Sequence, residues 1–270
     1  MPTAFGLING LDRSNVMHMK RHSCSAIRLV AIALLAMVCV CLAGCGGIHD
    51  VAKNGNLENV QMLLKSHPDL VFSKDKNGET ALHLAVNGGY KDLVELLLRN
   101  KSEVNAKSNT GITPLFYAAL GGNKDMVAML LTSKAEVNAK ETAGGLAALH
   151  LTAIFGHYDA AKLLLANKAD VEVRNRNGET PLHLAANRGQ SDVAKLLLAS
   201  HAEVNARDNI GDTPLQKAVF SGNKDMAALL LANKAEVNAT NNVGETPMYF
   251  AAARGGQGMT ELLRQHGGHE

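Results

Sequence analysis

The sequence predicts an all-α repeat protein, a solenoid in which helix-turn-helix units stack side by side. One long segment occurs twice, as NGETALHLAVNGGYKDLVELLLRNKSEVNAKS from Asn77 and as NGETPLHLAANRGQSDVAKLLLASHAEVNARD from Asn177. The same frame is marked by glycines at spacings of 33, 34, 33, 33 and 33 residues: Gly78, Gly111, Gly145, Gly178, Gly211 and Gly244. A fixed period of this length is typical of repeat architectures, whose units bury their apolar faces against one another.

Residues 1–44 are expected to be a leader that the mature protein lacks. The run from Leu29 to Leu42 is 14 apolar or small residues and follows Arg28. This length fits a signal peptide, which needs about 7–15 apolar residues, and is short of the roughly 20 of a membrane span. Asp12 does not fit a basic start, and we therefore expect translation to begin at Met19, in the basic segment MKRHSCSAIRLV.

The end of this run, LAGC from Leu42 to Cys45, resembles the lipobox of bacterial lipoproteins. The resemblance implies cleavage before Cys45, lipid attachment to its sulfur, and a membrane-anchored place in a bacterial cell envelope, facing the periplasm or the surface. Gly46 in place of Asp resembles outer-membrane lipoproteins. Two alternatives stay open: an ordinary secretory signal, and a retained membrane anchor that extends to Ile48.

The composition without the leader excludes several kinds of function. Residues 1–45 hold four basic residues and one acidic residue, which leaves 23 of 27 basic and 24 of 25 acidic residues. This balance has no basic excess for nucleic acid. All four cysteines lie in the same stretch, so the body can form no internal disulfide or cysteine-based zinc site.

Each unit can be interpreted in chain order. A turn glycine permits positive φ, a threonine two residues later can cap a helix, and proline suits the first helical position. The segment LHLAA begins a short helix that ends at a glycine. In DVAKLLLAS, from Asp192, apolar residues at 193, 196, 197 and 198 define one face of a second helix. The closing EVNA is extended.

This pattern, G-x-T-P-L-H-x-A-A followed by L-L-L and V-N-A, resembles the ankyrin repeat from Ile48 to about Gly267. The resemblance implies an ankyrin solenoid of paired antiparallel helices with β-hairpin fingers. The ankyrin-repeat domain then spans 45–270, with units at about 48–76, 77–109, 110–143, 144–176, 177–209, 210–242 and 243–268. The first unit lacks the G-x-T-P start and is expected to close one end of the stack with a polar face.

Two departures from the ankyrin pattern concern the backbone. Residues other than glycine occupy the left-handed position after the second helix: Lys101, Lys134, Lys168, His201 and Lys234. We expect each to cost roughly 1–2 kcal/mol unless a preceding asparagine takes the strained angle, as Asn100, Asn167 and Asn233 could. The finger at AGGLAALH, from Ala143, has one extra residue and lacks the threonine and proline, and is expected to be the least rigid.

Candidate catalytic and metal-ligating residues do not converge. Equivalent histidines at His83, His150 and His183 lie on helices expected to pack about 8–10 Å apart, whereas ligands of one zinc ion lie within ~4 Å of each other. The resemblance implies that this histidine bonds the backbone of the neighbouring finger. Carboxylates in separate fingers are interpreted as solvated charge: Glu79, Glu179, Asp212 and Glu245. We expect no enzyme activity, cofactor or metal.

The resemblance places partners on the concave face and the fingertips. Two consecutive units would bring five apolar residues together there: Ile112, Leu120, Leu146, Ile154 and Phe155. Further contact residues are expected beside them: Arg174, Arg176, Arg188, Arg207 and Phe220. An apolar centre with arginine beside it has the composition of an interaction hot spot. The alternative is that these apolar residues only pack between first helices.

These observations predict a monomeric, non-enzymatic scaffold that is anchored through acylated Cys45 and binds a partner protein, with no nucleic acid. One alternative is an envelope protection or assembly factor, acting as a holdase or as an accessory to a periplasmic enzyme. Another is an exported effector that binds host proteins.

Overall fold

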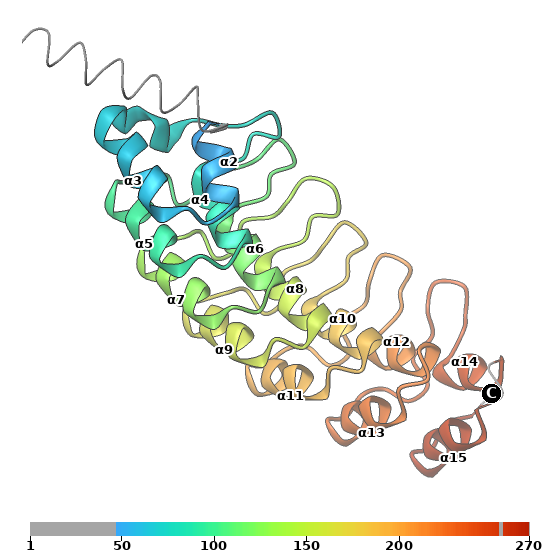
Figure 1. The fold of residues 1–270 in the computed structure, drawn as a ribbon. Helices are drawn as coiled ribbons and strands as arrows, with labels where there is room; N and C mark the ends of the chain where they lie inside the picture. Colours follow the sequence, from blue (N-terminus) through green and yellow to red (C-terminus); the bar gives the residue numbers. More distant parts are fainter. Residues whose placement is uncertain (1–46, 254–255, 270) are drawn as a thin grey trace, which may run out of the picture.

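The computed structural model describes residues 47–253 and 256–269, which form seven helix pairs stacked in a row. Figure 1 shows first helices in one row, second helices in another, and loops that project to one side as fingers. The first helices are α2 (Ile48–Lys53), α4 (Ala81–Asn87), α6 (Pro114–Leu120), α8 (Ala148–Phe155), α10 (Pro181–Arg188), α12 (Pro214–Phe220) and α14 (Pro247–Ala253).

The second helices are slightly longer. They are α3 (Leu57–Ser66), α5 (Lys91–Arg99), α7 (Lys124–Thr132), α9 (Tyr158–Ala166), α11 (Ser191–Ala199), α13 (Lys224–Ala232) and α15 (Gln257–Gln265). A short 3-10 helix, η1 (Pro68–Phe72), follows α3. The all-α solenoid predicted from the repeat is therefore confirmed.

The core is one continuous layer between the two rows of helices. Each of the five central pairs places one leucine from its first helix and one from its second at 0–1% exposure: Leu82 and Leu97, Leu115 and Leu130, Leu149 and Leu164, Leu182 and Leu197, Leu215 and Leu230. The same cluster reaches from Ile48 to Leu263. Because a helix of seven to nine residues cannot cover such side chains alone, the stacking of neighbours holds the units together.

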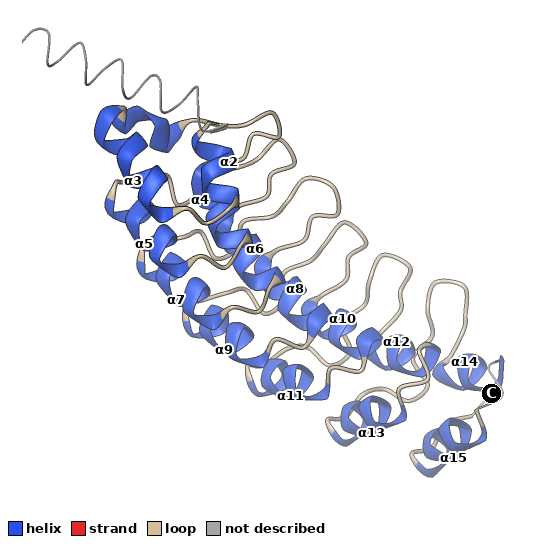
Figure 2. Cartoon of the chain, viewed as in Figure 1, coloured by secondary structure: helices blue, strands red, loops and turns tan. Residues whose placement is uncertain are grey.

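The described fingers turn back on themselves as β-hairpins do, but their two arms are not joined by a ladder of backbone hydrogen bonds. Backbone hydrogen bonds close each turn, as from the Asn175 amide to the Glu179 carbonyl (3.0 Å). Another joins each tip to the preceding one, as from the Asn209 amide to the Asn177 carbonyl (2.9 Å). Among the described residues, pairing of the β type is limited to an isolated bridge between Lys140 and Ala147, and Figure 2 draws the fingers as loops. The predicted hairpins are thus tight turns bonded to their neighbours.

Glycine is required where successive fingertips meet. Gly178 has a φ of +77°, and a Cβ there would lie 2.3 Å from Asn209 Oδ1 and 2.8 Å from the Asn209 amide nitrogen. Any side chain would push the next finger away, which explains why the 33-residue frame is marked by glycine.

The left-handed position after the second helix is occupied by the non-glycine residues themselves. Positive φ values of 62–68° occur at Lys101, Lys134, Lys168, His201 and Lys234. The prediction that a preceding asparagine takes this angle is wrong, since φ is −82° at Asn100, −100° at Asn167 and −95° at Asn233. Each of these asparagines instead donates its Nδ2 to the carbonyl four residues earlier, at 2.8–2.9 Å.

The finger with the extra residue is braced by a carboxylate. Glu141 accepts hydrogen bonds from the amides of Ala143 (2.5 Å), Gly144 (2.6 Å) and Leu146 (3.0 Å). Burial raises the pKa of Glu141, but these backbone donors outweigh that effect and lower it. We expected this finger to be the least rigid because it has one extra residue and lacks the threonine and proline, and these features do not reveal the bonds that Glu141 makes.

Within residues 47–253 and 256–269, no helix combines the length and the apolar character that a membrane span needs. The predicted leader and the predicted lipid-attachment residue Cys45 lie outside the described residues.

Candidate interaction surface

In four units the base of the finger is tied to the helix that follows by the same geometry, made by His83, His150, His183 or Gln216, whereas Phe116 and Tyr249 take this place in two others. The His83 Nδ1 accepts a hydrogen bond from the Thr80 amide (3.1 Å), so its Nε2 is left to donate to the Ile112 carbonyl (3.0 Å). His150 and His183 make the equivalent bonds to the carbonyls of Glu179 and Asp212. The structural role that the resemblance implied for these histidines is confirmed.

The same histidines are held neutral by burial. Desolvation lowers the pKa of His83 and His183, and it lowers that of His150 to about 4. In the unit at 210–242, Gln216 replaces histidine and makes the same two bonds, accepting from the Thr213 amide and donating to the Glu245 carbonyl, both at 2.8 Å. The amide of glutamine and the imidazole of histidine are therefore interchangeable at this position. We infer that the role of this position is to hold neighbouring fingers in place.

Of the four carboxylates interpreted as solvated charge, Glu79 and Asp212 are buried, so that interpretation is wrong for these two, and Glu179 and Glu245 are half-buried. Glu79 is 9% exposed and accepts a hydrogen bond from the Tyr117 hydroxyl. Burial, and then this bond, raise the pKa of Tyr117. Asp212 is 7% exposed. Within the part of the chain that the structure describes, no group of histidine, cysteine and carboxylate side chains could hold a metal ion.

Lys217 on α12 forms a buried ion-pair network that the sequence pattern did not indicate. Its Nζ lies 2.7 Å from Asp208 Oδ2, 3.1 Å from Asp212 Oδ2 and 3.9 Å from Glu179 Oε1. Burial lowers the pKa of Lys217, but its hydrogen bonds to the two aspartates outweigh that effect and raise it. One cation on α12 thus joins the finger that leads into this helix to the finger before it.

Three of the five predicted apolar residues lie on two consecutive first helices, α6 and α8. Leu120 and Phe155 are 36% and 50% exposed, and Ile154 between them is half-buried. His157 connects the two helices, because its Nε2 lies 3.1 Å from the Leu120 carbonyl and its ring stacks on Phe155 with centroids 5.9 Å apart. We call the exposed surface of Leu120, Ile154 and Phe155 the apolar rim.

The other two apolar candidates belong to the finger bases. Ile112 and Leu146 are half-buried, and Leu146 packs against the core. They lie in the fingers that lead into α6 and α8, on the same two units as the apolar rim, but less of each is accessible to a partner. The alternative that such residues only pack within the stack therefore fits Leu146 better than Phe155.

The candidate arginines differ in what they contact. Arg207 Nη2 donates to the Thr240 carbonyl at 2.6 Å, Arg174 Nη1 donates to the Arg207 carbonyl at 2.7 Å, and Arg176 donates to the Thr142 carbonyl. These three side chains join neighbouring fingers while staying exposed. Arg188 ends α10, the first helix that packs next to α8, and is exposed.

Phe220 forms a second apolar cluster, with aromatic residues of the last unit that our interface prediction omitted. Its ring meets Phe250 edge-on at 5.8 Å, and Phe250 meets Tyr249 at 5.7 Å. Phe220 and Tyr249 are 47% and 52% exposed. Repeat alignment could have indicated Tyr249 and Phe250, since they take the places of residues 216 and 217 on the first helix of the preceding unit.

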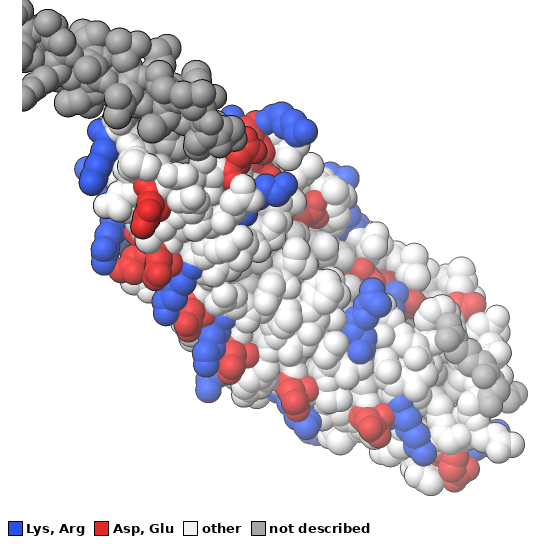
Figure 3. Space-filling view, viewed as in Figure 1, with Lys and Arg blue, Asp and Glu red and all other residues white. Residues whose placement is uncertain are grey.

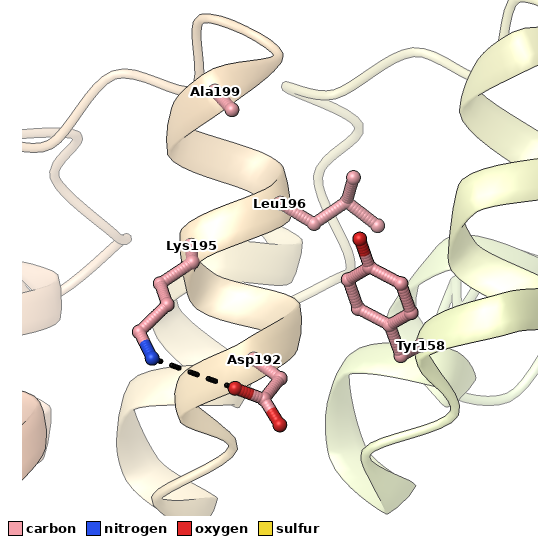
Figure 4. A pocket seen from close by; sticks show the side chains of 5 residues that line it. All are labelled: Tyr158, Asp192, Lys195, Leu196 and Ala199. Atoms are coloured by element: carbon pink, nitrogen blue, oxygen red, sulfur yellow. Dashed lines mark hydrogen bonds and ion pairs between the residues drawn. The ribbon is translucent and has the colours of Figure 1, made fainter.

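Charge is distributed unevenly over the molecule. In Figure 3 the charged side chains follow the second helices and the fingers, whereas the surface over α6 and α8 is largely uncharged. An open groove of about 430 Å³ lies elsewhere, between α9 and α11, and is lined by Tyr158, Asp192, Lys195, Leu196 and Ala199 (Figure 4). Its two charged residues pair with each other at 3.5 Å.

Comparison with known proteins agrees with this geometry. The sequence matches the family of ankyrin repeats, described in three copies, over residues 48–141, 140–208 and 202–270. No curated protein matches the chain. The matched segments and the stacked helix pairs together show that this chain belongs to the ankyrin-repeat family, whose members bind protein partners.

Proposed function

We propose that the protein is a non-enzymatic scaffold that binds a partner protein through its concave face and fingertips while acylated Cys45 holds it in a bacterial cell envelope. The observation that supports partner binding best is the apolar rim, because Leu120, Ile154 and Phe155 form an uncharged, partly exposed surface across two units. Exposed clusters of this kind usually mark binding sites. Arg188, on the neighbouring first helix α10, supplies the polar edge typical of a hot spot.

Rigid fingers favour recognition by a preformed surface. Backbone bonds join neighbouring tips, and histidine or glutamine bonds fix four of the finger bases, at Ile112, Glu179, Asp212 and Glu245. A partner then binds without ordering flexible loops, which lowers the entropic cost of association.

The anchor part of the proposal rests on the LAGC motif after an apolar run. A diacylglycerol on Cys45 plus an N-acyl chain gives more than one buried chain, which is needed because a single acyl chain binds membranes only marginally. Mass spectrometry of the mature N-terminus tests it: the expected species begins at acylated Cys45, and an unmodified Cys45 or an uncleaved leader contradicts it.

Partner binding is tested with a double variant, Leu120→Ser with Phe155→Ser. Neither residue belongs to the buried core, so folding should persist. Full-length protein captures its partner from envelope fractions, and the partner, once identified and purified, is titrated by calorimetry. We expect one-to-one binding and a Kd at least about tenfold weaker for the double variant, since losing two apolar anchors costs more than 1.4 kcal/mol.

The matched control is Met62→Ser with Phe72→Ser, which removes apolar side chains of 59% and 56% exposure in the first unit, two units away from the apolar rim. Its Kd should equal that of the native protein. An unchanged Kd in the Leu120/Phe155 variant excludes the apolar rim as the binding site. Capture of many denatured proteins with no stoichiometric partner favours the holdase alternative.

A further inference from the structure

We propose that the N-terminal end of the solenoid rests on the phospholipid surface, with Met62 in the headgroup layer and the stack standing away from the membrane. This inference rests on the proposed acylation of Cys45. It adds an orientation and a second membrane contact, made by folded residues, to that anchor.

The first argument is the length of chain between the anchor and the fold. Helix α2 begins at Ile48, which is 2% exposed and part of the core. Only Gly46 and Gly47 separate Cys45 from this helix. From Cys45 to Ile48 the chain advances by three residues, which span at most about 10 Å. An acylated Cys45 at the headgroup level therefore holds the first helix pair against the bilayer surface.

The second argument is the direction in which Met62 points. Figure 4 shows Leu196 of α11 directed toward Tyr158 of α9, the second helix of the preceding unit. By repeat alignment Met62 of α3 takes the place of Leu196. The equivalent residues of the other units are all partly buried against the core: Leu96, Met129, Leu163, Leu196, Leu229 and Leu262. Met62 is 59% exposed, because no described helix pair precedes its own.

The third argument is the composition around Met62. The residues that replace Asp192, Lys195 and Ala199 of the groove in Figure 4 are Glu58, Gln61 and Lys65, all exposed. One apolar side chain among polar ones suits the headgroup layer and not the hydrocarbon interior. Lys65 can keep its ammonium among lipid phosphates while its carbon chain lies beside Met62.

The last helix at the opposite end of the stack lacks this feature. The described residues of α15 and the chain after it, up to residue 269, expose no large apolar side chain, and Met259 and Leu263 are buried. The exposed apolar side chains of the last unit, Val243 and Tyr249, lie in its finger and on its first helix α14. Of the two terminal second helices, α3 and α15, α3 is therefore the one whose described residues expose a large apolar side chain. With units stacked about 10 Å apart, the apolar rim would stand roughly 20–30 Å above the lipid.

The experiment uses the absence of tryptophan from the sequence. Met62→Trp places a single fluorophore at the N-terminal end, and Val243→Trp places one at the last finger, where the native side chain is 78% exposed. Both full-length, acylated variants are reconstituted into vesicles of equal amounts of phosphatidylethanolamine and phosphatidylglycerol, with or without acyl chains brominated near the glycerol. We expect bromolipid to quench Met62→Trp and shift its emission to shorter wavelength, and to leave Val243→Trp unchanged.

The possible failures are distinguishable. If both variants carry diacylglycerol and stay with the vesicles but Met62→Trp is not quenched, the end contact is wrong while the anchor stands. If mass spectrometry finds no lipid on Cys45 and neither variant binds vesicles, the anchor and the end contact are both wrong. A Met62→Trp emission shift that depends on protein concentration without lipid assigns the end face to a second copy of the chain and overturns the proposal.

Discussion

At the scale of the residue, one imidazole at the base of a finger forms hydrogen bonds with two backbone groups, and only its neutral form can form both. His150 accepts from one amide through Nδ1 and donates through Nε2, which requires the tautomer protonated at Nε2. Protonation of Nδ1 would remove the acceptor. Burial lowers the pKa of His150 to about 4. The neutral ring therefore makes both bonds at neutral pH, and acid removes the bond that Nδ1 accepts.

We expect the free energy of unfolding to fall as the pH drops from 6.5 toward 4. In this window the unfolded chain takes up a proton at residue 150 that the folded chain does not, and the loss from this one residue approaches about 3 kcal/mol below the folded pKa. His150→Gln removes this part of the loss because Gln216 shows that glutamine makes the same bonds.

Urea unfolding at pH 7.5 and pH 4.5 measures this difference. Native protein and the glutamine variant should have similar stability at pH 7.5, where imidazole is neutral in both states, which serves as the control. An equal loss of stability in both proteins at pH 4.5 would show that His150 does not contribute to acid sensitivity.

At the scale of the element, five of the seven described second helices are followed by a non-glycine residue in the strained left-handed conformation. Lys134 follows α7 with a φ of 66°, which costs a residue with a Cβ roughly 1 kcal/mol more than glycine. We expect Lys134→Gly to raise the free energy of unfolding by about 1 kcal/mol, measured by urea denaturation.

The neighbouring position provides a matched control. Ser133 has a φ of −81°, so Ser133→Gly gains nothing from relief of strain and should lower stability slightly through backbone entropy. Equal effects of the two glycine substitutions would show that the positive φ is not strained in this loop.

At the scale of the whole molecule, stability depends on the neighbours of each unit. Leu182 and Leu263 are both 0% exposed, but Leu182 lies in a unit with neighbours on both sides and Leu263 lies in the last described helix. We expect Leu182→Ala to cost about 2–5 kcal/mol and to uncouple the two halves of the stack. Leu263→Ala should mainly loosen α15.

Urea unfolding followed by circular dichroism tests this contrast. The central variant should show a lower midpoint and a broader transition than native protein, and the terminal variant a small shift in midpoint. Identical shifts for the two variants would contradict a stability that sums over neighbouring units.

The repeat pattern was sufficient to predict the helix pairs, because the same leucine positions recur in every unit. It could not predict the network around Lys217, since Glu179, Asp208 and Asp212 come together only when two fingers pack on α12. The repeat pattern also could not predict how exposed each candidate surface residue is. It selected both Phe155, which is half exposed, and Leu146, which packs on the core. Spacing defines a face, but the neighbouring units decide how much of a side chain they cover.

The bonds between fingertips always join one unit to the next at the same register, as Asn209 does to Asn177 and Asn242 to Ile210. Because each of these bonds joins adjacent units, none of them depends on the total number of units. A gene segment of one period could therefore be duplicated or lost by unequal recombination, and the new junction would still find matching donors and acceptors. Array length is free to evolve in whole steps, while the two dissimilar ends limit where such exchanges can occur.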